Sequence, residues 1–200
     1  MTLPIEAVTK YSPATSATIT VDSLEAKKHL MVQAKLIASG GAIDARLTFN
    51  ADSGSNYATR RNFSGGTDGT STSLAYIEDL VNGGNEDFFI NMDIINVATK
   101  EKLVITQSVG VGGTHPSRAN TVGKWANTSN PLDVVSHFNT SSGSYTTGSE
   151  CVVLGWDPTD THTTNFWEEL ASVTLDGDAS EISSGTISAK KYLWVQVYFQ

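Results

Sequence analysis

Side chains that can act as nucleophiles, bases or metal ligands are few in this sequence and scattered along it. The chain has a single cysteine, Cys151, which lies in an apolar run, whereas a reactive thiol needs a basic neighbour. Its four histidines are His29, His115, His137 and His162. No G-x-S-x-G, H-E-x-x-H or Walker pattern occurs. We therefore predict that the protein is not an enzyme and holds no metal ion or cofactor.

Two segments bear on the metal prediction because they carry oxygen or nitrogen ligands close together. His162 lies with two aspartates in the polar stretch 157–164, which we interpret as a solvated linker, with a metal site as the alternative. Residues 50–54 begin like a calcium loop, but Arg61 stands near the position where such a loop places its bidentate glutamate. A turn held by Asn and Asp side chains explains residues 50–54 better.

The aromatic side chains form the next candidate group, because tryptophan is suited to buried packing and to binding surfaces alike. The chain has four tryptophans, Trp125, Trp156, Trp167 and Trp194. A sugar-binding surface is one interpretation of this group. Three of the four lie in strand-like or repeated segments, which favours packing in a core or an interface.

One segment of the chain occurs twice. Residues 24–36 and 187–199, which lie 163 positions apart, are identical at six of thirteen positions. His29 corresponds to Tyr192, which indicates an aromatic packing position rather than a metal ligand. We interpret the second copy as a spare version of the opening strand, carried on a C-terminal arm. Such an arm can be donated to a sheet of another subunit, or it can pair within its own chain.

The C-terminal copy alternates as a β-strand does. One face carries Leu193, Val195, Val197 and Phe199. The other carries Tyr192, Trp194, Gln196 and Tyr198. Trp167, at the root of the arm, is a second anchor. We predict that Trp167 and the apolar and aromatic residues of the arm form a subunit interface.

Strand patterns elsewhere predict the fold class. Residues 28–36, 42–50, 87–96, 102–108, 132–138 and 150–156 read as strands separated by Gly-, Ser- and Asn-rich turns. Short helices are expected at 73–81 and 165–170. The pattern predicts an all-β protein, an antiparallel two-sheet sandwich with a C-terminal strand extension. We expect a sandwich domain over 1–156 and a linker with the arm over 157–200.

Charge and hydropathy exclude some partners. The 200-residue chain has a net charge of −8, and its basic residues are scattered, so nucleic acid is not an expected partner. No apolar run is long enough to cross a membrane. The first ten residues lack the pattern of a signal peptide, so synthesis in a cytoplasm is expected.

Two segments resemble a known group of proteins. Residues 47–57 read L-T-F-N-A-D-S-G-S-N-Y and resemble the F-N-x-D-[ST]-G-x-N-Y segment of structural proteins from tailed phages and related environmental viruses. Residues 144–155 are similar to the F-x-x-G-S-x-x-x-L-Y-G strand that closes the same domains, although Tyr145 and Trp156 depart from the pattern. The resemblance spans about residues 15–156. It implies a sandwich of jelly-roll type in a virion, a tail or a fibre.

The repeat and the resemblance lead to one functional hypothesis and two alternatives. The hypothesis is a virion structural protein, as capsid, decoration or tail fibre, that assembles with copies of itself and with other virion proteins. One alternative is a tail-fibre module that binds a receptor or a host-surface glycan. The other is a surface-filament subunit polymerised by strand donation, which would need an export signal.

Overall fold

A computed structural model describes residues 6–11, 15–78, 84–111, 116–157, 170–171, 173, 177, 179–190, 193 and 195. These residues form strands, turns and irregular segments, and none of them is helical. The strands are β1 (Glu6–Tyr11), β2 (Thr18–Val21), β3 (His29–Leu36), β4 (Ala38–Ser39), β5 (Ala45–Phe49), β6 (Tyr57–Phe63), β7 (Gly69–Leu74), β8 (Ile77–Glu78), β9 (Phe88–Ile95), β10 (Lys102–Gly110), β11 (Ser117–Trp125), β12 (Val135–Asn139), β13 (Ser144–Tyr145) and β14 (Glu150–Trp156).

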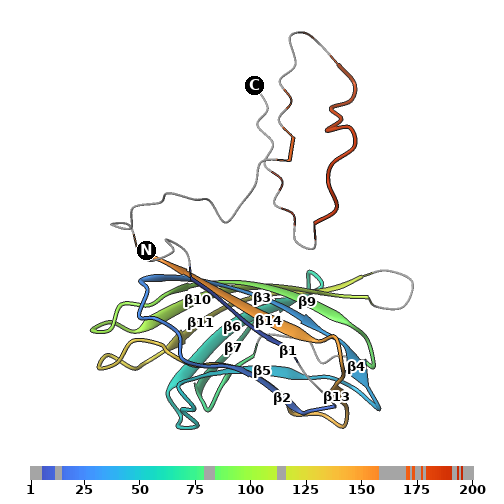
Figure 1. The fold of residues 1–200 in the computed structure, drawn as a ribbon. Coiled ribbons are helices and arrows are strands. Elements are labelled where there is room, and N and C mark those ends of the chain that lie inside the picture. The colour runs from blue at the N-terminus through green and yellow to red at the C-terminus, as the bar shows by residue number, and fades with distance from the viewer. Residues whose placement is uncertain are drawn as a thin grey trace. The chain divides into compact units, whose positions relative to one another are not determined.

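The strands form two principal sheets that face each other. The large sheet has eight strands in the order β1-β14-β3-β9-β10-β11-β6-β7, and the small sheet has four in the order β2-β12-β5-β8. Strands β4 and β13 form a separate pair. Figure 1 shows the large sheet as the upper layer of this domain and β2 and β5 in the lower layer. All strand pairings are antiparallel, so the all-β, antiparallel, sandwich-like fold predicted from the sequence is confirmed.

Eight of the strands pair in a nested way. Strand β1 pairs with β14, β2 with β12, β3 with β9, and β5 with β8. The partners in each pair therefore lie progressively closer in sequence, as in one long hairpin. Pairing of β14 with β3 and of β12 with β5 then joins the nested pairs into two sheets.

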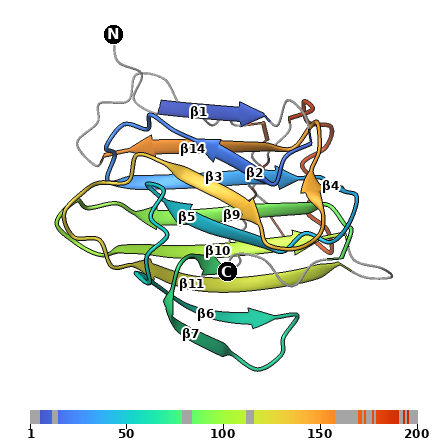
Figure 2. The same cartoon turned by 90° about the horizontal axis from the view of Figure 1, so that it is seen from below.

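Four more strands widen the large sheet beyond the small one. Strands β10, β11, β6 and β7 follow β9 in the sheet order. In Figure 2 strands β6 and β7 extend past the strands of the small sheet. Close packing of the two sheets continues as far as Gly123 of β11, where an added Cβ would lie 3.0 Å from the side chain of Ile77. A glycine at this position lets the edge of the small sheet approach the large one.

The core lies between the sheets and contains a cluster of aromatic residues. The rings of Phe49, Tyr57 and Trp125 lie with centroids 5.8 to 6.3 Å apart. All three side chains are at most 1% exposed. The Tyr57 hydroxyl lies 3.0 Å from the Phe49 backbone nitrogen, which donates to it, so its polar group is satisfied inside the core.

The strand repeated near the C-terminus is not the opening strand, contrary to the sequence interpretation. It is β3, which is preceded by β1 and β2. Strand β3 also lies inside the large sheet, with β14 on one side and β9 on the other. Because both of its edges are occupied, a second copy of β3 has no vacant place beside its own neighbours.

The short helix expected at 73–81 is absent from the described residues 73–78. Strand β7 runs to Leu74, and β8 begins at Ile77. Ser73 has a φ of 57°, a left-handed conformation that no α-helix accommodates. The helix expected at 165–170 falls almost wholly outside the described residues.

The chain divides into two compact units, residues 1–163 and 164–200. In the first unit the last strand, β14, ends at Trp156. In the second unit the described residues belong to neither strand nor helix. Four of its described apolar side chains are exposed, at 46% for Val173 and Ile182, 55% for Leu193 and 77% for Val195.

Candidate functional site

Strand β10 has one buried face and one open face, and the open face carries three large aliphatic side chains. Burial alternates along the whole strand. The inward-facing Val104 is 2% exposed, whereas the outward-facing Leu103, Ile105 and Val109 are 54%, 58% and 41% exposed. The solvated face of an antiparallel sheet usually carries polar residues. The outward face of β10 therefore departs from the usual pattern.

The pairing register arranges the outward side chains of neighbouring strands into rows that cross the sheet. One row contains Trp156, His29, Ile95, Leu103, Lys124 and Ala58. The next contains Met31, Asp93, Ile105, Val122, Arg60 and Thr70. Directly opposite side chains have Cβ atoms about 4.5–5.5 Å apart. The aliphatic members of the two rows therefore form one continuous strip.

A groove with a volume of ≈ 590 Å³ lies over these two rows. It is lined from Trp156 and His29 at one end to Arg60 and Thr70 at the other, and is called the outer-face groove below. Its exposed aliphatic side chains are Ile95, Leu103, Ile105 and Val122. Its volume lies within the range typical of ligand sites, which are also mostly apolar with a few polar groups.

An aromatic pair forms one end of the outer-face groove. The His29 and Trp156 rings stack with centroids 5.5 Å apart and planes inclined by 15°. The pair results from register, because β14 and β3 place the two residues directly opposite each other. The aromatic packing role predicted for His29 is confirmed.

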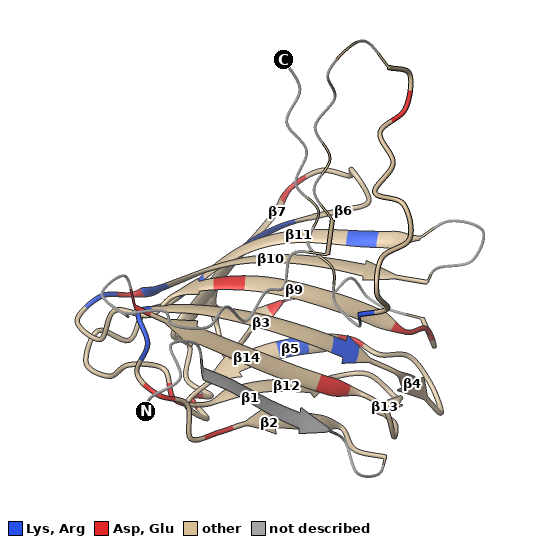
Figure 3. Cartoon of the chain, turned by 45° about the horizontal axis from the view of Figure 1, so that its top comes forward, with Lys and Arg blue, Asp and Glu red and all other residues tan. Residues whose placement is uncertain are grey.

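Charged groups in the outer-face groove are few. Most of β9, β10 and β11 is neither acidic nor basic (Figure 3). At one end Arg60 pairs with Asp68 at 3.0 Å, and Lys124 pairs with Glu101 at 2.9 Å. Asp93 lies within the groove, and burial raises the pKa of its carboxyl group. The groove thus disfavours an unpaired negative charge at Asp93.

A row of amide side chains lies beside the two groove rows. It contains Gln33, Asn91, Gln107, Asn120 and Asn62, directly opposite one another on five strands. Amide groups donate and accept hydrogen bonds at the same time. The outward face of the large sheet therefore combines an apolar groove with a polar border.

The calcium-like segment at 50–54 is a structural turn. Asn50 and Ala51 both have left-handed backbone conformations, with φ of 50° and 54°. The Asp52 carboxylate accepts hydrogen bonds from the Trp125 indole at 2.6 Å, the Asn56 amide at 2.9 Å and the Gly54 backbone N–H at 2.8 Å. Burial alone would raise the pKa of Asp52, but these hydrogen bonds outweigh it and the pKa lies below its ordinary value. This geometry agrees with the interpretation of residues 50–54, made from the sequence, as a turn held by Asn and Asp side chains.

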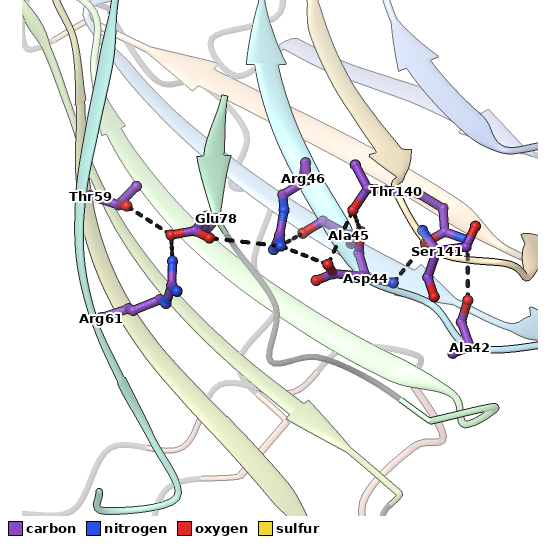
Figure 4. Close-up of polar contacts among 10 residues, drawn as sticks. Ala42, Asp44, Ala45, Arg46, Thr59, Arg61, Glu78, Thr140 and Ser141 are labelled. Atoms are coloured by element: carbon purple, nitrogen blue, oxygen red, sulfur yellow. Dashed lines mark hydrogen bonds and ion pairs between the residues drawn. The ribbon is translucent and has the colours of Figure 1, made fainter. Parts of the chain in front are cut away.

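A second polar cluster ties together the edges of the two sheets (Figure 4). Glu78 of β8 forms an ion pair with Arg61 of β6, accepts a hydrogen bond from Thr59 at 3.4 Å, and lies 3.7 Å from Arg46 of β5. Arg46 also pairs with Asp44 at 2.6 Å. Burial, followed by the nearby positive charge of Arg46, lowers the pKa of Arg61. These charges neutralise one another, and we assign the cluster a structural role.

The predicted interface residues are only partly visible. Trp167, Tyr192, Trp194, Val197, Tyr198 and Phe199 lie outside the described residues. Leu193 and Val195 are described and exposed. At 187–190, 193 and 195 the chain is not in a strand. The two described residues do not test the predicted interface, and the donated strand stays a prediction.

Two of the four tryptophans considered for a sugar site, Trp125 and Trp156, lie among the described residues. Trp125 is buried in the core, and Trp156 lies in the outer-face groove. Among the histidines, His29 lies in the groove and His137 is buried, while His115 and His162 fall outside the described residues.

No protein-family model, no curated protein and no solved structure matches this chain. In the part of the chain that the structure describes, no group of three His, Cys, Asp or Glu side chains is placed to hold a metal ion. The same residues include no helix long and apolar enough to span a bilayer.

Sequence reasoning missed the outer-face groove, although the sequence carries a signal for it. Leu103, Val104 and Ile105 are consecutive apolar residues in one strand, as are Ile94 and Ile95 in another. Because successive side chains point to opposite faces, such runs place apolar groups on both faces of a sheet. The signal requires knowing that only one of these faces is covered.

Proposed function

We propose that this chain is a non-enzymatic structural protein of a virion whose copies assemble with one another, with the C-terminal arm as a contact. The observation that carries the proposal is the exposed aliphatic strip on the outward face of β9, β10 and β11. Monomeric soluble proteins rarely expose contiguous apolar patches of large size, and such patches mark interaction sites. The strip lies on regular strands, which suits a fixed contact surface.

The exposed strip can contribute to an association but does not suffice for it alone. Full burial of a Leu, Ile or Val side chain is worth about 1.5–3 kcal/mol. Leu103, Ile105 and Val122 are each more than half exposed, so each retains roughly half of that amount. Ordering two subunits has its own cost. Several such contacts per subunit are therefore needed, as expected for a repeating assembly.

We further propose that the domain is a jelly roll, the finer fold named from the resemblance. The nested pairing of β1 with β14, β2 with β12, β3 with β9 and β5 with β8 supports it. A jelly roll is a double-sheet sandwich of eight strands built from two Greek keys, and it recurs in viral capsid proteins and in lectins. In this proposal β6, β7, β10 and β11 are insertions that widen one sheet. Fold alone does not fix function, so the exposed strip carries the greater part of the argument.

Sedimentation velocity and negative-stain microscopy of the purified full chain test the assembly proposal. We expect the mean mass to rise with concentration and discrete particles or regular arrays to be visible. Deletion of 187–200 is expected to leave a folded chain of monomer mass. A wild-type chain that stays monomeric at every concentration would contradict the proposal.

A glycan-binding module is the second candidate, and one observation favours it. Trp156 and His29 form an aromatic surface at the end of the outer-face groove, and an amide row borders the groove. Rings for stacking and amides for hydroxyl groups are what a sugar site requires. A glycan array separates the candidates, because binding that is lost in Trp156→Ala would support the module.

A further inference from the structure

The C-terminal arm can be aligned with β3 residue by residue, and the structure shows which way each β3 side chain points. The inward side chains of β3 are Leu30, Val32, Ala34 and Leu36, all at most 2% exposed. The arm residues at the corresponding positions are Leu193, Val195, Val197 and Phe199. The arm therefore carries a face with the pattern of the core face of β3.

That face of the arm is uncovered where it is described. Leu193 is 55% exposed and Val195 is 77% exposed, whereas Leu30 and Val32 in β3 are 2% and 0% exposed. The arm cannot occupy the position of β3 in another copy without displacing it, because β14 and β9 flank β3. It needs a different apolar surface.

We propose that the outer-face groove of one copy receives the C-terminal arm of a second copy, with Leu193 and Val195 packed across the row that contains Ile95 and Leu103. This inference rests on the assembly function proposed above and names its acceptor surface. The arm lies flat on the sheet, side chains against side chains, as a second layer packs on a sheet. It does not extend the sheet at an edge.

The dimensions of the arm and the groove agree. The first groove row crosses from β14 to β6, five strand spacings, which amounts to about 24 Å at about 4.8 Å each. Ten extended residues span about 33 Å. Residues 190–199 are therefore long enough to cover the groove from end to end.

The charges of the arm and the groove are complementary. Residues 188–200 contain Lys190 and Lys191 and no acidic residue. The groove contains Asp93, while its two cations, Arg60 and Lys124, already form ion pairs. A lysine of an incoming arm next to Asp93 stabilises the carboxylate that the apolar surroundings disfavour.

Disulfide trapping between two full-length variants tests the proposal. One variant carries Leu103→Cys and a purification tag, and the other carries Val195→Cys without the tag. The native Cys151 is 0% exposed and stays in both. The matched control replaces Leu103→Cys by Val109→Cys, on the same strand and the same face but outside the groove.

After mixing and mild oxidation, we expect the Leu103→Cys and Val195→Cys chains to form a covalent heterodimer about tenfold faster than the control pair, because a bound arm raises the local thiol concentration. Equal rates for the two pairs in a chain that still self-associates would overturn the groove contact and leave the assembly function standing. A chain that neither cross-links nor self-associates would overturn both.

A cross-link that forms only within one chain carrying both cysteines would assign the arm to its own groove. A change in Trp156 fluorescence when an apolar small molecule is added, without a cross-link between chains, would assign the groove to that molecule. Either of these results contradicts the proposal.

Discussion

Ile94 and Ile95 are neighbours on one strand, have the same side chain and occupy opposite environments. Ile94 points between the sheets and is 2% exposed, and Ile95 points outward and is 41% exposed. Val104 and Ile105 repeat the contrast on the adjacent strand, at 2% and 58%. The same residue type therefore serves two purposes in the large sheet.

The comparison separates the apolar side chains of the large sheet that form the core from those that do not. The small sheet covers the inward residues, which form the core with the Phe49, Tyr57 and Trp125 rings. The outward residues do not lie in that core cluster. The proposed contact between copies of the chain rests on this exposed apolar face.

The largest effect is expected on the inward side, at Trp125. Trp125→Ala removes the largest fully buried side chain and the indole donor to Asp52. We expect the free energy of unfolding to fall by about 3–5 kcal/mol. Urea denaturation measures it, and a loss below about 1 kcal/mol would show that this end of the core is not packed as described.

The pair Ile94→Ala and Ile95→Ala tests the comparison itself. We expect Ile94→Ala to lower the free energy of unfolding by about 2–5 kcal/mol and Ile95→Ala to change it by only about 0.5 kcal/mol. Self-association should respond in the opposite order, with Ile95→Ala the weaker associator. Equal destabilisation by both substitutions in urea denaturation would abolish the distinction between the faces.

Asp52→Asn tests the turn that holds the edge of the core, and its effect should depend on pH. The folded-state pKa of Asp52 lies below its ordinary value, so its stabilisation is fully present above the unfolded pKa and disappears as the pH falls through the folded pKa. At neutral pH we expect a loss of about 1.5–3 kcal/mol, typical of hydrogen bonds to a charged group. The difference between variant and wild type should shrink as the pH falls below about 4. A difference independent of pH would argue against an ionised Asp52.

A smaller loss of stability than at Trp125, Ile94 or Asp52 is expected at the aromatic end of the groove. His29→Ala removes the stacked partner of Trp156, worth about 0.5–1.5 kcal/mol. His29→Phe keeps a ring and should restore most of that stability. Thermal denaturation measures both variants, and identical values for His29→Ala and wild type would mean that the stack contributes nothing.

The sequence predicted the all-β class because alternation and turn chemistry are local signals. It identified β3, β5, β9, β10, β12 and β14 to within a few residues, but not the other eight strands. Among these, β6, β7 and β11 have sequences rich in Thr, Ser, Arg and Asn. Polar strands of this kind form because neighbouring strands pair with them, so the pattern of their own residues does not predict them. The helix expected at 73–81 was wrong for the described part because a left-handed serine interrupts it.

The candidate site was harder to predict than the fold. The groove depends on register, since Trp156, His29, Ile95 and Leu103 come from four strands far apart in sequence. A shift of one residue in any pairing would send one of these side chains to the other face. The repeat at 187–199 was visible in the sequence, but its first copy is not the opening strand. That copy is β3, which lies inside the large sheet between β14 and β9.

The central claim is that the outward face of β9, β10 and β11 is a contact surface between copies of this chain. Sedimentation of the double variant Leu103→Ser and Ile105→Ser beside the wild type, with urea denaturation of both, tests it most directly. We predict a variant that remains monomeric at concentrations where the wild type associates, with a free energy of unfolding within about 1 kcal/mol of the wild-type value. A variant that associates as strongly as the wild type would contradict the claim.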